Sequence, residues 1–420
     1  MIRRIEALNY RCLRYIDQPL MGFHVLVGPN ASGKTTFLDV ISFLSDLLNG
    51  GLEKVIDLRT SDFFDLLFAH QGKRFQLAVE LEIPDSCRKL LPREQEFDTV
   101  RYEVAIGWVE EASEVHILDE KVILSAATSK PAKQRTLFPQ PPIPPDTIMT
   151  GRSHQGQRRI ITKKYEGNDN YYSEVHAKGG KGWAPSFRLG PKQSALGNLP
   201  ADEERFPVSS WLQGVLRDGV QEIMLNSLAL RKSSAPGQGL GFRPDGANLP
   251  WILHNLEKED SKRYDAWISH VRTALEDIAQ IETKEIPDTR SRYLKLIYQN
   301  GLEVPSWMAS DGTLRLLALT VPAYLSSFKG IYLIEEPENG IHPMAMETVF
   351  QAMRSVYSAQ ILLATHSPVV LSNADPESVI CFKKDADGAT DMVLGSEHPE
   401  LRNWQGEVNF SVLYASGVLG

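Results

Sequence analysis

Cysteine, net positive charge and long apolar runs are all scarce in this 420-residue chain, and each shortage excludes a class of protein. The three cysteines lie far apart and form no Cys-x-x-Cys pair, which excludes a disulfide framework and a structural zinc site. The net charge of −8 excludes a uniformly basic nucleic-acid binder, so any DNA contact must be local. No apolar run is long enough for a signal peptide or a membrane span, and we expect a cytoplasmic protein with no membrane partner.

A phosphate-binding loop is the most informative feature that is present. Residues 28–35 fit the pattern G-x-x-x-x-G-K-[ST], between a predicted strand at 23–27 and a predicted helix at 34–48. The glycines let the backbone wrap around phosphate oxygens, the lysine adds a positive charge, and the hydroxyl binds Mg²⁺. The pattern therefore predicts that the chain binds ATP and Mg²⁺. The residues expected at the nucleotide are Asn30, Ala31, Ser32, Gly33, Lys34, Thr35 and Thr36.

The patterning along the chain predicts three segments. Residues 1–128 combine the phosphate loop with alternating strands at 75–83 and 100–108, which indicate an antiparallel β subdomain. Residues 129–290 form an insertion that is loop-rich at first, with many prolines and glycines, and then mainly helical. Residues 291–420 return to alternating strands and helices, which is typical of a parallel α/β core. We expect the first and last segments to share one sheet, since neither is complete alone.

Two carboxylates follow an apolar strand at 331–334. Ligands bind at the carboxyl ends of the strands in such sheets, so Glu335 and Glu336 are expected at the phosphates. We assign Glu335 to the metal ion together with Thr35, and Glu336 to the attacking water as the catalytic base. A pair of acids that merely ends a strand at a solvated turn is the alternative interpretation, and the phosphate loop makes it the weaker one.

Two further sites complete the pattern. His366 follows the apolar strand at 360–364, in a position from which it can sense the γ-phosphate; an ordinary structural histidine is the alternative. Ser310 and Gly312 lie at the start of a predicted helix, where they are either simple capping residues or a second phosphate-binding device.

Taken in order, these sites resemble the ATP-binding-cassette class of ATPases, in the branch that contains RecF, the SMC proteins and the OLD family. Residues 28–35 match the Walker A motif, 331–336 match Walker B, and 338–343 resemble the D-loop region. Ser310-Asp311-Gly312 resembles the signature motif, and Thr365-His366-Ser367 matches the switch histidine. The resemblance implies an α/β ATPase head with a parallel central sheet, an antiparallel β subdomain and a mainly helical insertion.

The resemblance also implies a mechanism. Two heads would close on two ATP molecules in a head-to-tail homodimer or a higher even oligomer, each site taking Ser310 and Gly312 from the partner. Arg11 matches the turn at which this branch places a residue beside the nucleotide. The glutamine loop is not identified, although Gln71 and Gln76 lie in the right region. A glutamate at 335 departs from the aspartate that many of these ATPases carry.

Several functions fit such an ATPase. The motif at 310–312 is not L-S-G-G-Q, which disfavours a transporter, and the missing Cys-x-x-Cys and heptads disfavour a zinc-hook repair protein. The stretch after His366 is too short for a Toprim nuclease domain, so we expect no nuclease in the chain. The first hypothesis is a regulatory ATPase that controls a separately encoded effector, a nuclease or toxin, in anti-phage defence.

The second hypothesis is a RecF-like repair or recombination ATPase that binds DNA through a local basic run. A solvated flexible loop is the simpler interpretation of that run. Its residues are Arg152, Arg158, Arg159, Lys163 and Lys164.

Overall fold

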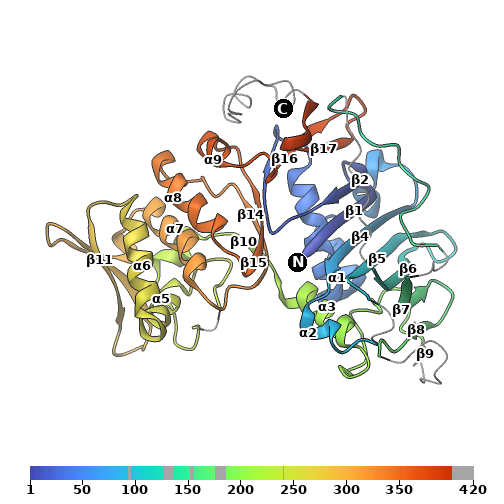
Figure 1. Ribbon diagram of the computed structural model, residues 1–420, viewed down its shortest axis with the longest axis horizontal. Coiled ribbons are helices and arrows are strands. Elements are labelled where there is room, and N and C mark those ends of the chain that lie inside the picture. Colours follow the sequence, from blue (N-terminus) through green and yellow to red (C-terminus); the bar gives the residue numbers. More distant parts are fainter. Residues whose placement is uncertain (93–95, 127–136, 152–155, 176–185, 240, 400–420) are drawn as a thin grey trace.

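A six-stranded sheet forms the centre of the computed structural model (Figure 1). The model describes residues 1–92, 96–126, 137–151, 156–175, 186–239 and 241–399. The strand order is β10 (Val220–Ile223), β14 (Gly330–Glu335), β15 (Ala359–Ala364), β3 (Phe23–Val27), β16 (Val379–Lys384) and β17 (Thr390–Leu394). All neighbours are parallel except β16 and β17. The predicted α/β fold class is confirmed, and strands from both ends of the chain share this sheet.

The register of the sheet brings the loops of interest to one edge. Glu335 at the end of β14 pairs with Ala364 at the end of β15, which in turn pairs with Leu26 near the end of β3. The turns that follow these strands carry the acidic pair, the histidine and the phosphate loop. Residues far apart in sequence are therefore neighbours at the carboxyl edge, which is the usual binding edge of parallel sheets.

Helices cover both faces of the central sheet (Figure 1). The helix α1 (Lys34–Asp57) lies on one face, where Leu333 and Leu362 join its apolar cluster. On the other face, Tyr332 and Leu363 belong to a second apolar cluster, which includes residues of three helices on that face. These are α7 (Asp311–Thr320), α8 (Pro343–Arg354) and α9 (Pro368–Asn373). Burial on both faces explains why the strands are continuous apolar runs.

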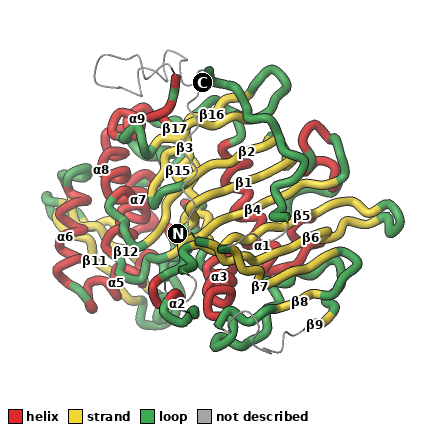
Figure 2. Tube along the Cα trace, turned by 45° about the vertical axis from the view of Figure 1, so that its right-hand side comes forward, coloured by secondary structure: helices red, strands yellow, loops and turns green. Residues whose placement is uncertain are grey.

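An eight-stranded, antiparallel sheet packs on the outer side of α1 (Figure 2). Its order is β2 (Leu13–Pro19), β1 (Ile2–Tyr10), β4 (Arg74–Glu82), β5 (Thr99–Val109), β6 (Glu114–Ser125), β7 (Gln157–Lys164), β8 (Asp169–Tyr171) and β9 (Ser186–Phe187). Phe43 of α1 contacts Tyr10 and Phe75 edge-on, which joins the two layers. The alternating strands predicted at 75–83 and 100–108 are present as β4 and β5.

Residues 157–175, 186 and 187 differ from the loop expected there. They supply β7, β8 and β9, and Ile160 and Ile161 of β7 are fully buried. The many prolines and glycines around this stretch concealed a short strand of β-branched residues. The middle of the chain also supplies β10 to the central sheet. The division at 128 and 290 stays a prediction.

The lobe beside α7 and α8 contains α4 (Ser227–Arg231), α5 (Leu249–Glu259), α6 (Ser261–Arg272), β11 (Ile278–Glu285), β12 (Arg292–Tyr298) and β13 (Glu303–Pro305). Outside this lobe, α2 (Asp85–Arg88) packs on α3 (Pro207–Asp218), which packs on α1. Short 3₁₀ helices span Phe63–Leu66, Phe68–His70, Ser306–Met308, Val321–Tyr324 and Gly395–Glu397. Trp267 of α6 is buried, and its indole N–H donates to Thr320 Oγ1 at 3.0 Å. Among the described residues, no helix is both long and apolar enough to cross a bilayer.

Two local details refine the predicted boundaries. Gly51 has φ +78°, so α1 is interrupted three residues beyond the predicted stop and then resumes to Asp57. A hairpin turn at Asn300-Gly301, the strongest short sequence signal for a hairpin, connects β12 to β13, and Gly301 has the positive φ, +82°, that such turns require.

The buried carboxyl group of Glu174 gives a prediction for pH. It accepts hydrogen bonds from the backbone N–H groups of Val208 and Ser209 at 2.6 and 2.9 Å, and burial raises its pKa to about 7. Because the unfolded chain releases this proton near pH 4.5, the free energy of unfolding should fall as pH rises from 4.5 to 7. The free energy of unfolding, measured with denaturant at pH 5 and at pH 8, should differ less between the two pH values in Glu174→Gln than in the wild type. The exposed Glu204→Gln is the control, and an unchanged difference in Glu174→Gln would contradict the prediction.

Candidate functional site

The phosphate loop connects β3 to α1, and its two glycines are required by what packs against them. A Cβ on Gly28 would lie 2.4 Å from the carbonyl oxygen of Phe382. A Cβ on Gly33, whose φ is +106°, would lie 2.3 Å from Thr390 Oγ1. Both distances are well inside van der Waals contact, so no larger residue fits. The loop is therefore held in shape by the strands β16 and β17 as well as by its own sequence.

Lys34 stabilises the loop from within. Its ammonium donates to the carbonyl oxygens of Gly28 at 2.8 Å and Pro29 at 2.9 Å. Burial lowers the pKa of Lys34, and the nearby carboxylates, Glu335 foremost, oppose that shift. An ammonium has three N–H donors, so one remains for a ligand above the loop. Lys34 is placed as the phosphate loop pattern predicts.

Thr35 and Glu335 are brought together across the chain. The Thr35 hydroxyl donates to Glu335 Oε2 at 2.7 Å. Burial raises the pKa of Glu335, and the hydrogen bond from Thr35 opposes this effect. A hydroxyl and a carboxylate are hard oxygen donors of the kind that Mg²⁺ prefers. Among the described residues, no group of three or more acidic, histidine or cysteine side chains could hold a metal ion. The donor set therefore fits Mg²⁺ held mainly by phosphate and water oxygens.

Glu336 has a fixed and unusual conformation. Its φ is +47°, in the left-handed region, and its N–H donates to the carbonyl oxygen of Ala364 at 2.8 Å. Asn339 Nδ2 donates to Glu336 Oε2 at 2.7 Å. One carboxylate oxygen is thus held by a hydrogen bond, and Glu336 lines two of the cavities at the loop. This is the arrangement that a general base needs.

His366 is positioned through its backbone by Glu338. The N–H of His366 donates to Glu338 Oε1 at 2.7 Å, and the Thr365 hydroxyl donates to Glu338 Oε2 at 2.9 Å. Burial and the charge of Lys34 lower the pKa of His366, which favours the neutral imidazole. His366 lines one cavity with Asn30 and Glu336, so the structure brings these three predicted residues together.

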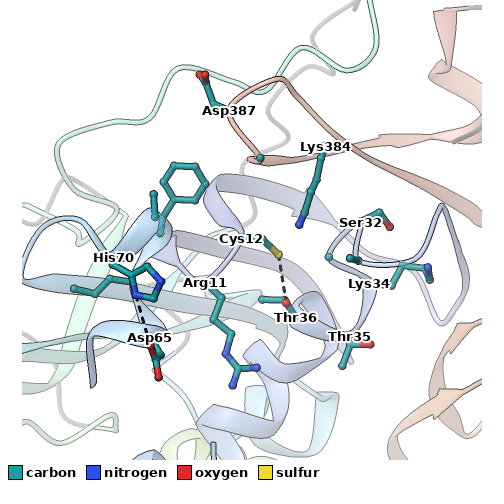
Figure 3. Close-up of a pocket in the computed structure, with 16 residues that line it drawn as sticks. Arg11, Cys12, Ser32, Lys34, Thr35, Thr36, Asp65, His70, Lys384 and Asp387 are labelled. Atoms are coloured by element: carbon teal, nitrogen blue, oxygen red, sulfur yellow. Dashed lines mark hydrogen bonds and ion pairs between the residues drawn. The ribbon is translucent and has the colours of Figure 1, made fainter. Parts of the chain in front are cut away.

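A second cavity, of about 540 Å³, is lined by residues of the loop and of the start of α1 (Figure 3). Its lining includes the predicted residues Arg11 and Ala31 through Thr36. Arg11 pairs with Asp39 Oδ2 at 3.2 Å, so its guanidinium is partly neutralised where it lies. A third cavity joins Arg11 and Thr35 to Glu335 and Glu336. Arg11 and Thr35 therefore line both the 540 Å³ cavity and the cavity of the acidic pair.

Strained backbone is concentrated around these cavities. Eight non-glycine residues in the described part of the chain have positive φ. Those that line one of the cavities at the loop are Arg11, Ala31, Ala69, His70 and Glu336. Such conformations cost about 1–3 kcal/mol each and persist where the surroundings impose them, commonly at functional sites. The strain is independent support for a functional site here.

Some predicted residues are not brought to the loop. Ser310 Oγ accepts from the Thr313 N–H at 3.1 Å as an N-cap of α7, and the Gly312 backbone lies against the Gly340 carbonyl. Neither lines any of the three cavities at the loop. Gln76 is buried and accepts from the Ile148 N–H, and Gln71 lines a separate cavity, so the structure supports neither as a glutamine-loop residue.

Sequence reasoning missed several contributors. Glu338 and Asn339 were noted only as part of a motif, and their hydrogen bonds to Thr365 and Glu336 were not foreseen. Their acid and amide types in the turn after the acidic pair were the available signal. Lys384 lines the 540 Å³ cavity, and no sequence pattern pointed to it.

The comparisons with known proteins agree with this geometry. Residues 133–372 match a family model described as an "AAA domain", and that description names the AbiEii toxin of type IV TA systems. Residues 1–178 match a model described as "AAA ATPase domain". The chain is 46% identical over 44 residues to the OLD nuclease of Thermus scotoductus, a match that spans 10% of this chain and 8% of that relative.

Solved structures of SMC heads align with this chain, and one of them shares the fold. This structure, an Smc head bound to the C-winged helix domain of ScpA, aligns with a TM-score of 0.51 at 16% identity, over 93% of this chain and 96% of that chain. The SMC head domain from Thermotoga maritima aligns with a TM-score of 0.46 at 10% identity, over 94% and 98%. The first family model covers more than half of the chain. The chain therefore belongs to that AAA family of ATP-hydrolysing enzymes, and its fold is similar to that of an Smc head.

Proposed function

We propose that ATP-driven dimerisation of this ATPase controls a separately encoded effector, a nuclease or toxin, in anti-phage defence in the cytoplasm. The observation that carries the dimer is the position of Ser310 and Gly312. They begin α7, a helix whose N-terminal N–H groups suit phosphate, yet neither lines a cavity at the chain's own loop. A second copy would supply them. The toxin named in the family description supports the effector part of the proposal.

In this mechanism each side chain has one task. Lys34 and the loop backbone bind the β- and γ-phosphates. Thr35 and Glu335 would hold Mg²⁺, whose charge would help to neutralise the negative charge that develops on the phosphates. Glu336 orients and deprotonates the attacking water, and Asn339 fixes the carboxylate that does so. His366 contacts the γ-phosphate. Loss of the γ-phosphate removes this contact, and the change in His366 is passed on to Glu338, which accepts hydrogen bonds from the His366 N–H and from the Thr365 hydroxyl.

Dimerisation follows from the same contacts. The γ-phosphate, bound to Lys34 of one chain, is also bound by Ser310 of the other, so its binding free energy holds the heads closed. Hydrolysis removes that bridge and the heads separate. An effector that contacts only one of the two states is then switched by ATP turnover.

The alternative, a RecF-like DNA-binding ATPase, is weakened because two residues of its basic run are engaged within the chain, although Lys164 is exposed. Lys163 is buried and pairs with Asp169 at 2.9 Å, and Arg158 Nη1 donates to the Glu174 carbonyl at 3.1 Å. Both side chains serve the antiparallel sheet, so neither lies on a solvated loop. Arg152 lies outside the described residues.

Affinity purification tests the proposal. Tagged Glu336→Gln protein, recovered from its host with ATP present, should bring down one protein of nuclease or toxin type in stoichiometric amount. Lys34→Ala, purified in parallel, should not retain that protein. Recovery of DNA without a protein partner would instead support the repair hypothesis and overturn the effector proposal.

A further inference from the structure

The hairpin of β16 and β17 is attached directly to the phosphate loop. Cys381 of β16 pairs in parallel register with Val27, the last residue before the loop. The Thr390 hydroxyl of β17 donates to the Ser32 carbonyl at 2.9 Å, and the Thr390 N–H donates to the Cys12 carbonyl at 2.9 Å. The hairpin is thus a wall of the nucleotide pocket. It lies beyond residue 372, outside both matched family models.

Lys384 projects from this wall into the pocket. It is the last residue of β16, and it lines the 540 Å³ cavity together with Arg11 and the start of α1. In Figure 3 the Lys384 ammonium lies between Cys12 and Ser32, while the carboxylate of Asp387 points away from that ammonium. The hairpin contacts described above fix the position from which the side chain projects.

Lys384 also differs from the other two cations of the pocket. Arg11 is paired with Asp39, and Lys34 is bonded to two loop carbonyls. Within the described residues, the side chain of Lys384 makes no ion pair and no hydrogen bond, whereas its backbone belongs to the ladder of β16 and β17. A cation held over a phosphate loop without a counter-charge is suited to an anionic ligand.

We propose that Lys384 is a nucleotide-binding residue that contacts a phosphate oxygen in the 540 Å³ cavity, which neither Glu336 nor His366 lines. The acidic pair and His366 lie in other cavities, where the γ-phosphate is proposed to bind. Lys384 therefore contacts the part of the nucleotide that ATP and ADP share. This inference rests on the proposed placement of the nucleotide at residues 28–35.

Equilibrium binding of ATP and ADP to Lys384→Gln, by calorimetry, tests the inference. Loss of a charge-assisted contact at an exposed position should raise the Kd of both nucleotides by about five- to tenfold. The unliganded melting temperature should not change, because the side chain is exposed. Lys384→Arg should retain most of the affinity.

Lys383→Gln is the matched control, since the adjacent lysine alternates to the other face of β16, pairs in register with Asp391 and does not line the cavity. An unchanged Kd in Lys384→Gln, an equal loss in Lys383→Gln, or a loss for ATP alone would each overturn the inference. Lys34→Ala distinguishes a failure of the nucleotide placement from a failure of the role of Lys384. If Lys34→Ala binds normally, the nucleotide placement itself fails; if only Lys384→Gln binds normally, the placement stands and the role of Lys384 fails.

Discussion

Glu336→Gln should bind ATP normally and hydrolyse it at least about 100-fold more slowly. The amide keeps an oxygen that can accept the Asn339 hydrogen bond seen at 2.7 Å, and the backbone N–H bond to Ala364 does not involve the side chain. Only the capacity to accept a proton from water is lost. Under the proposed mechanism the bound γ-phosphate then persists, and the protein should accumulate as a closed dimer. Single-turnover hydrolysis and sedimentation velocity, each with ATP and Mg²⁺, measure the two effects.

Glu347→Gln is the control for that variant. Glu347 is an exposed glutamate of α8 whose Oε1 accepts from Gln351 one helical turn later, so its amide should leave turnover and sedimentation unchanged. Adding Ser310→Arg to Glu336→Gln should abolish the dimer and preserve the binding of ATP by the single chain. A turnover rate in Glu336→Gln equal to that of the wild type would contradict the assignment of the base.

The parts of the site that sequence could predict are those written in one short stretch. The phosphate loop is a contiguous pattern whose lysine and hydroxyl have fixed tasks, and its flanking strand and helix are visible as apolar periodicity. Glu335 and Glu336 were predictable because two carboxylates directly follow four apolar residues. The meeting of Thr35 with Glu335 across 300 residues followed from the parallel sheet alone.

What could not be predicted depends on distant contacts. The order of strands in a sheet is decided by packing, so β10, four residues long, gave no sign that it lies beside β14. The left-handed backbone of Ala31 and Glu336 is imposed by surroundings that their own sequence does not encode. Gln76 lies in the region in which a glutamine-loop residue is expected, but its side-chain oxygen accepts a hydrogen bond from the Ile148 N–H.

The segment after residue 129 shows how composition misleads. Proline and glycine content there predicted a loop, since average composition over a long window hides an eight-residue strand such as β7. The charged side chains of β7 also differ from the sequence interpretations, which were a DNA contact or a solvated flexible loop. Lys163 is buried against Asp169, so this lysine of the basic run forms an internal ion pair in the structure.

Lys34→Ala should weaken ATP binding by at least about 100-fold and abolish turnover. The side chain is buried, and its ammonium holds the carbonyls of Gly28 and Pro29 at 2.8 and 2.9 Å. Alanine therefore removes the charge that meets the phosphates and also the contacts that close the loop before any ligand arrives. Because ammonium–phosphate bonds are charge-assisted and this one is largely desolvated, its loss should exceed that of a surface lysine. Calorimetric titration with ATP measures the change in Kd.

The same helix offers a matched control for this loss. Lys54 is exposed near the far end of α1, beyond the interruption at Gly51, so Lys54→Ala should bind ATP as the wild type does. Lys34→Ala also leaves Glu335, Glu336 and Glu338 without their nearest compensating charge, since these carboxylates are the ones that oppose the lowering of the Lys34 pKa. Their mutual repulsion should rise, which further disfavours the approach of a triphosphate. Wild-type affinity in Lys34→Ala would mean that the nucleotide binds somewhere other than the loop, and the roles assigned to Thr35, Glu336 and His366 would fall together.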